Sequence, residues 1–127
     1  MAYGKELIID LHNCNTDLFT RRMLKKYVVG LCEILNMERA KLTWWDYRYA
    51  PLAKLNAPPH LKGISVAARI MVQFITTSTV IIHTLEDKGA AYINVFSCKD
   101  FDLDTVKNFT ADYFDGVIAN STVVVRL

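Results

Sequence analysis

Three side chains that can do covalent chemistry, Ser78, His83 and Cys98, lie within one short stretch of the sequence. A serine hydroxyl or a cysteine thiol becomes a nucleophile when a base activates it, histidine is the commonest base, and a thiol can also donate a proton. The stretch from Thr76 to Cys98 contains two apolar, β-branched runs on either side of the turn residues Glu86 to Gly89. This pattern predicts a β-hairpin.

The register of this hairpin decides which of these side chains meet. With the turn centred within Glu86 to Gly89, Cys98 lies across from Thr77, beside the Thr77–Ser78 peptide bond. Opposed Cβ atoms are about 4.5–5.5 Å apart, so we expect Ser78 and Cys98 to be neighbours. Five residues of strand span about 16 Å, so a single chain does not bring its own His83 to Ser78.

Each of these residues also has a purely structural interpretation. A serine at a strand end and a histidine in an apolar strand are usually structural, and a buried cysteine commonly behaves as a small hydrophobic residue. The connection Thr76-Thr77 favours a functional role, because neither threonine favours the positive φ of a tight hairpin. We therefore expect a strained or bulged backbone there, and such strain concentrates at functional sites.

Periodic patterns around the hairpin predict the elements that position it. Apolar runs predict strands over residues 5–11, 41–47, 64–75, 79–84, 91–97 and 121–127. An amphipathic helix is predicted over 19–34 and a shorter one after Asp102, with the N-cap of the first among Asn15, Thr16 and Asp17. Residues 48–62 contain three prolines and predict a loop.

The resulting order, β-α-β-β-β-β-α-β, predicts an α+β fold. We expect a two-layer sandwich, in which two helices cover one face of an antiparallel sheet. The 127 residues show no internal repeat and no linker, so a single domain covers residues 1–127.

Composition excludes several classes of function. A net charge of +2 is too small to indicate a nucleic-acid or membrane partner, and the basic cluster Arg21 to Lys26 fits the solvated face of a helix. No apolar run approaches the ~18 residues of a membrane span. Charged residues within the first twenty argue against a signal peptide, so we expect a cytoplasmic protein. Cysteine and histidine spacings argue against a disulfide scaffold and against any metal site.

The hairpin resembles one family of small enzymes. Its Ser-x4-His-Thr spacing, acidic turn and strand ending in Phe-Ser-Cys resemble the bacterial and archaeal S-adenosylmethionine decarboxylases. The positions that match that family in identity and spacing are Ser78, His83, Thr84, Phe96 and Cys98. The element order also fits, so the resemblance covers most of the chain. It implies that family's fold and a role in polyamine (spermidine) biosynthesis.

The resemblance implies a pyruvoyl cofactor that the chain makes from its own Ser78. In the family, the serine hydroxyl attacks the preceding carbonyl, and a β-elimination helped by the histidine cuts the chain; here the cut bond is Thr77–Ser78. The ketone then holds the substrate's α-amine as a Schiff base and withdraws electrons as CO2 leaves. By the family's roles, Cys98 protonates the resulting carbanion and His83 acts in processing. Ser65 is the nearest candidate for a second processing serine.

The resemblance also implies a small-molecule substrate and a homodimer with two shared active sites. In the bacterial enzymes the serine and the cysteine of each site come from one chain and the histidine from the other. Asp87 falls where the family carries a ribose-binding glutamate. Trp45 is a candidate for stacking on adenine, although strand alternation places one residue of the pair Trp44-Trp45 in the core.

Departures from the family pattern leave two alternatives open. Thr77 replaces the usual glutamate before the processing serine, Leu85 replaces an aromatic residue and Glu86 replaces a proline. These changes affect the residues expected to contact the substrate more than those expected to form the pyruvoyl group. One alternative is therefore a pyruvoyl-dependent decarboxylase of ornithine or arginine. The other is a homologue that does not process and serves as a binding or regulatory partner.

Overall fold

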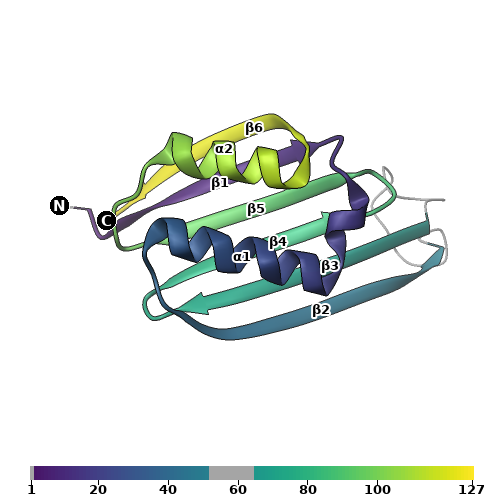
Figure 1. The fold of residues 1–127 in the computed structure, drawn as a ribbon, viewed down its shortest axis with the longest axis horizontal. Helices are drawn as coiled ribbons and strands as arrows, with labels where there is room; N and C mark the ends of the chain where they lie inside the picture. The colour runs from purple at the N-terminus through teal and green to yellow at the C-terminus, as the bar shows by residue number, and fades with distance from the viewer. Residues whose placement is uncertain (1, 52–64) are drawn as a thin grey trace.

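Two helices lie side by side on one face of a six-stranded antiparallel sheet (Figure 1). The computed structural model describes residues 2–51 and 65–127. In chain order the elements are β1 (Gly4–His12), the 3-10 helix η1 (Thr16–Phe19), α1 (Arg21–Leu35), β2 (Arg39–Pro51), β3 (Ser65–Ile75), β4 (Ser78–Leu85), β5 (Ala90–Ser97), α2 (Leu103–Phe114) and β6 (Val117–Arg126). The strand order β2-β3-β4-β5-β1-β6 confirms the predicted α+β two-layer fold.

Some boundaries differ from the sequence prediction. β2 continues to Pro51, so the loop predicted over 48–62 is wrong for its first residues, and the rest of it lies outside the described residues. β6 starts at Val117, four residues before the predicted strand, because it pairs with the end of β1. Asn15 caps η1, whereas the N-cap of α1 is Thr20, whose hydroxyl accepts the N–H of Met23 at 3.2 Å.

The hairpin of β4 and β5 has the expected register, with His83 opposite Tyr92. The expectation of a strained backbone at Thr76-Thr77 is wrong. Among the described residues, positive φ angles occur at Asn13, Asn36, Gly89 and Asp115, and neither threonine has one. The pairing of β3 with β4 also runs to its last pair without a shift, so the two threonines close this turn in ordinary backbone conformations.

The hydrophobic core lies between the sheet and the helices. Alternate residues of the central strands face the helices and are fully buried, as Leu7, Val80 and Ile93 show. Tyr27 of α1 packs on the ring of Phe114 and shares a hydrogen bond of 2.7 Å with Thr110 of α2, which joins the two helices. No helix in residues 2–51 and 65–127 is long and apolar enough to cross a membrane.

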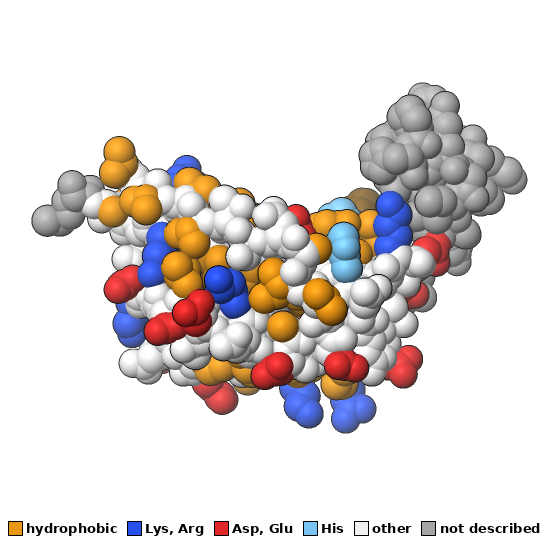
Figure 2. All heavy atoms as spheres, turned by 90° about the horizontal axis from the view of Figure 1, so that it is seen from above, with side chains coloured by type: hydrophobic (Ala, Val, Ile, Leu, Met, Phe, Trp, Pro, Cys, Tyr) orange, Lys and Arg blue, Asp and Glu red, His pale blue; other side chains and the backbone are white. Residues whose placement is uncertain are grey.

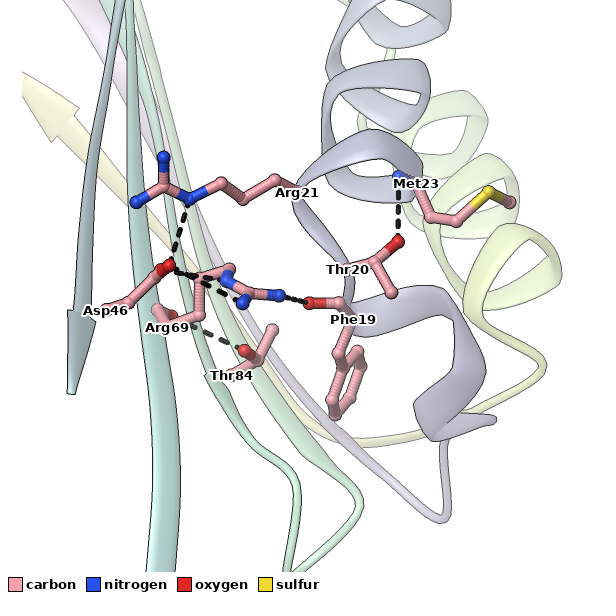
Figure 3. A network of polar contacts seen from close by, with 7 residues as sticks. All are labelled: Phe19, Thr20, Arg21, Met23, Asp46, Arg69 and Thr84. Carbon is pink, nitrogen blue, oxygen red and sulfur yellow. Dashed lines mark hydrogen bonds and ion pairs between the residues drawn. The ribbon is translucent and has the colours of Figure 1, made fainter. Parts of the chain in front are cut away.

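A buried arginine ties the start of α1 to the sheet (Figure 3). Arg69 of β3 is 8% exposed and donates through Nε to Asp46 of β2 at 2.8 Å. Its guanidinium also donates to the carbonyl oxygen of Phe19 at the end of η1. Arg21, the first residue of α1, makes a second ion pair with Asp46 at 2.9 Å. These contacts set the position of α1 relative to β2 and β3.

None of the described helices or strands covers the other face of the sheet, which we call the open face. One row of paired residues crosses it from β2 to β6: Trp45, Ile70, His83, Tyr92, Asp10 and Asn120. Large hydrophobic residues on this face are exposed, among them Trp45, Phe74, Ile81 and Val124. Figure 2 looks along the sheet from the β6 edge and shows hydrophobic side chains exposed between charged ones.

Candidate active site

Thr77, Ser78 and Cys98 meet where β3 turns into β4 and where β5 ends. The Ser78 hydroxyl donates to the sulfur of Cys98 at 3.8 Å and accepts the backbone N–H of Cys98 at 3.2 Å. The Oγ1 atom of Thr77 lies 2.8 Å from the same sulfur, at hydrogen-bond distance. The contact between Ser78 and Cys98 that the hairpin register predicted is thereby confirmed.

The peptide bond between Thr77 and Ser78 lies at the tip of a tight turn. β3 ends at Ile75, β4 begins at Ser78, and these two residues form the last pair between the strands. Thr76 and Thr77 make the connection and are exposed, whereas Ser78 is 5% exposed. The bond therefore joins an accessible residue to a buried one whose hydroxyl is held by the half-buried Cys98.

Residues of β1 hold the backbone around Cys98 in place. A Cβ atom on Gly4 would lie 2.2 Å from the carbonyl oxygen of Ser97 and 2.8 Å from the Cα of Cys98, so glycine is needed for this close approach. Lys5 pairs with Asp100 at 2.7 Å and donates to the carbonyl of Phe101 at 2.6 Å. Gly4 and Lys5 were not among the predicted site residues, because only the pairing of β1 with β5 reveals their proximity to this segment.

Hydrogen bonds lower the pKa of the Cys98 thiol. The strongest influence is the hydroxyl of Thr77, followed by that of Ser78. The other two thiols are shifted in the opposite direction, because burial raises the pKa of Cys14 to about 11 and also raises that of Cys32. Cys98 is therefore the most readily ionised of the three cysteines, and it is the one beside Ser78.

Two pockets of about 270 Å³ each flank Cys98. One is lined by residues Tyr3 to Lys5 and by the segment Cys98 to Asp100. The other is lined by Met37 and Glu38 and by the turn from Ile75 to Ser78. A small molecule can thus approach the sulfur from two sides.

His83 lies apart from this cluster. Along β4 the buried residues alternate with partly exposed ones, so Ser78 and Ile82 face the helix side while His83 lies on the open face. The five residue steps from Ser78 to His83 add about 16 Å along the strand. The His83 ring contacts the ring of Tyr92 edge-on at 6.3 Å, and partial burial lowers its pKa. One chain does not bring its histidine to its own serine.

Trp45 shares the open face with His83. Trp45 pairs with Ile70, which in turn pairs with His83, so the tryptophan and the histidine are two strands, or about 10 Å, apart. Trp45 is 68% exposed, whereas Trp44 packs against the core. The alternation that put one tryptophan in the core is confirmed, and it is Trp45 that stays accessible.

The remaining two predicted site residues lie away from Ser78 and Cys98. Asp87 is in the turn between β4 and β5, at the other end of β4 from Ser78, and it is exposed. Ser65 begins β3, where it pairs with Pro51, and its side chain lies outside the described residues.

Comparison with known proteins identifies the family. Residues 5–126 match the family model described as S-adenosylmethionine decarboxylase. The chain belongs to the S-adenosylmethionine decarboxylase family. The structure also resembles the crystal structure of the adenosylmethionine decarboxylase from Aquifex aeolicus, with a TM-score of 0.73 and 16% sequence identity over 98% of this chain and 91% of that one. Because the two sequences are only 16% identical, this structural similarity shows that the two proteins share a fold. No curated protein matches the chain.

Membership of the S-adenosylmethionine decarboxylase family gives the cluster an enzymatic context. The family supports an S-adenosylmethionine decarboxylase-like function, so the chain is a decarboxylase-like enzyme with a small-molecule substrate. Among the described residues there is no group of three or more His, Cys, Asp or Glu side chains that could hold a metal ion.

Proposed function

We propose that this chain is a self-processing, pyruvoyl-dependent decarboxylase of S-adenosylmethionine that serves polyamine (spermidine) biosynthesis. Self-cleavage between Thr77 and Ser78 would give fragments 1–77 and 78–127 and convert Ser78 into the pyruvoyl group. The observation that carries this proposal is the contact of the Ser78 hydroxyl with both the N–H and the sulfur of Cys98, beside that peptide bond.

The fold can accommodate this cut. Every β3–β4 pair except Ile75 with Ser78 lies away from the bond to be broken. In the sheet, β1 of the first fragment lies between β5 and β6 of the second. The two fragments are therefore interleaved and would remain held in one sheet after cleavage.

The roles of the residues follow from their positions. Ser78 supplies the attacking hydroxyl, and the N–H of Cys98 fixes the orientation of that oxygen. A pyruvoyl carbonyl supplies the electron sink that lowers the barrier to loss of CO2. The Cys98 sulfur, next to Ser78, is positioned to protonate the substrate carbon afterwards.

The proposal includes a homodimer in which two chains share each site. His83 lies too far from Ser78 to act on it within one chain, yet it is accessible on the open face. Exposed hydrophobic residues such as Phe74 and Ile81 on that face favour burial against a second copy. His83, Trp45 and Asp87 of the partner would then complete the site beside Ser78 and Cys98.

Two measurements test the proposed function. Intact-mass spectrometry of the purified protein should show two fragments split at Ser78, the smaller one with a blocked N-terminus. The cleaved protein should then release CO2 from S-adenosylmethionine, and not from ornithine or arginine supplied separately. A single uncut mass would favour a non-processing partner protein. Release of CO2 only from ornithine or arginine would replace the substrate and leave the processing chemistry intact.

A further inference from the structure

We propose that self-cleavage replaces a hydroxyl that donates to the Cys98 sulfur by a carboxylate that can only accept, so that the Cys98 thiol gives up its proton less readily after the cut than before. This inference rests on the proposed function and concerns how cleavage changes the hydrogen bonds of one sulfur atom. The feature that carries it is the double contact between Ser78 and Cys98, together with the second hydroxyl that Thr77 places on the same sulfur.

Before cleavage, two hydroxyl groups lie on the Cys98 sulfur. Thr77 Oγ1 is 2.8 Å from it, and the Ser78 hydroxyl donates to it at 3.8 Å. The thiol can donate to the Thr77 oxygen, but the thiolate can only accept from both hydroxyls and is stabilised by them. The lowered pKa of Cys98 agrees with this geometry. Because the family pattern has glutamate at position 77, the threonine hydroxyl is a feature of this chain.

Cleavage changes the chemical nature of one of these oxygens. The Ser78 oxygen bonds to the Thr77 carbonyl carbon as the C–N bond breaks, which gives an ester. Loss of the Ser78 α-proton then breaks the Cβ–O bond, and the oxygen leaves as part of the Thr77 carboxylate. One water converts the resulting enamine, through its imine, into the ketone and ammonia, so the atoms balance without an oxidant.

After cleavage, the former hydroxyl oxygen is a carboxylate oxygen that can only accept hydrogen bonds. The N–H of Cys98, which is 3.2 Å from this oxygen before the cut, is backbone and remains able to hold it there. A negative charge next to the sulfur disfavours the thiolate, and the protonated thiol can donate to the carboxylate instead. The product of cleavage thereby prepares Cys98 to deliver a proton.

The other charged groups around Cys98 do not change in this reaction. They are Lys5 of β1, Lys99 and Asp100 in the segment after β5, and Glu38 just before β2, with the phenol of Tyr3 beside them. Lys5 is paired with Asp100 at 2.7 Å. A difference in Cys98 between the uncut and cut chains therefore reports on Thr77 and Ser78.

The test is the pH dependence of Cys98 alkylation by iodoacetamide, followed by mass spectrometry, in the uncut and the cleaved wild-type chain. We expect the midpoint to rise by at least about one pH unit on cleavage, so that alkylation near neutral pH becomes about tenfold slower. Equal midpoints, or a lower one after cleavage, would overturn the inference while the cleavage itself still supports the proposed function. A chain that never cleaves would overturn both.

Two matched variants test the part played by the threonine hydroxyl. In the uncut chain, Thr77→Val removes the hydroxyl and should raise the alkylation midpoint of Cys98, whereas Thr77→Ser keeps the hydroxyl and should leave the midpoint near that of the wild type. Cys14 is buried and away from the change, so its alkylation serves as an internal control for folding. If Thr77→Val and Thr77→Ser behave alike, the hydroxyl does not hold the sulfur.

Discussion

At the scale of single residues, the Ser78 oxygen has a defined orientation before any chemistry begins. It accepts one backbone N–H and donates to one sulfur, both from Cys98. Two contacts to the same residue restrict the side-chain rotamer of Ser78, which is already buried. This order reduces the entropy that an attack on the neighbouring carbonyl must otherwise lose.

We predict that Ser78→Ala abolishes both chain cleavage and decarboxylation, because in the proposed function its hydroxyl is the attacking group and the source of the ketone. Intact-mass spectrometry and CO2 release measure the two effects. Ser121→Ala, on exposed β6, is the control and should cleave and turn over normally. Cleavage of the Ser78→Ala chain at the same bond would contradict the role given to Ser78.

We predict that Cys98→Ala lowers turnover about 10²–10⁴-fold, the usual range for loss of a general acid. Cleavage should slow much less, because alanine retains the backbone N–H that orients the Ser78 oxygen. Fragment ratios and steady-state kinetics distinguish the two effects, with Cys14→Ala as the control for loss of a thiol elsewhere. Equal loss of cleavage and turnover would remove Cys98 from the decarboxylation step.

At the scale of secondary-structure elements, the helix layer is joined to the sheet by a few polar contacts. Asp46 accepts from Arg69 of β3 and from Arg21 of α1, so one carboxylate links three elements (Figure 3). Burial by itself would raise the pKa of Asp46, but hydrogen bonds and charge from Arg69 and Arg21 outweigh it and lower the pKa. The carboxylate is therefore more stable as an anion in the folded chain than in the unfolded one.

We predict that Asp46→Asn lowers the free energy of unfolding by about 1.5–3 kcal/mol near neutral pH, because it removes charged hydrogen bonds to a buried arginine. Arg21→Ala, at the half-exposed partner, should lower it by less than about 1 kcal/mol. Urea denaturation measures both. A larger loss for Arg21→Ala than for Asp46→Asn would show that Arg69 does not depend on this carboxylate.

The same contact makes a prediction about pH. Because the folded pKa of Asp46 is below its ordinary value of 3.8, its contribution is complete above that value and is lost as the pH falls through the folded pKa. The stability difference between the wild type and Asp46→Asn should therefore shrink below about pH 4. A difference that is constant from neutral to acidic pH would contradict this assignment.

At the scale of the whole molecule, the candidate site is divided over the sheet. Thr77, Ser78 and Cys98 lie at one end of β4, His83 and Trp45 lie on the open face, and Asp87 is at the other end. A second copy packed against the open face is the simplest way to unite these groups, and two-fold symmetry would create two equivalent sites.

We predict that two inactive variants, Ser78→Ala and His83→Ala, restore activity when they are coexpressed. In a mixed dimer, the histidine of the Ser78→Ala chain faces the intact serine of the other chain, so one of the two sites works. Random pairing should yield about a quarter of the wild-type activity. Each variant expressed alone is the control, and a mixture that stays inactive and uncut would mean that the site is not shared.

Much of this molecule follows from sequence patterns of short range. Alternation along the strands predicted six strands and their order along the chain. The β4–β5 register and the contact of Ser78 with Cys98 were also predicted, because a hairpin register depends on a few residues around one turn. The spacing of Ser78, His83 and Cys98 also carried the resemblance to the family that the comparison confirmed. The predicted N-cap of the first helix was wrong, since Thr20 and Asn15 are equally suitable residue types and η1 separates them, whereas Asp102 caps α2 as expected.

Only the tertiary structure decided which distant groups surround the candidate site. β1 lies between β5 and β6, and this order puts Gly4 against Ser97 and Lys5 against Asp100. It also showed that the Thr77 hydroxyl reaches the Cys98 sulfur without the backbone strain that the sequence suggested. Patterns along a chain report which face each residue prefers, whereas contacts between atoms depend on how the strands are arranged beside one another.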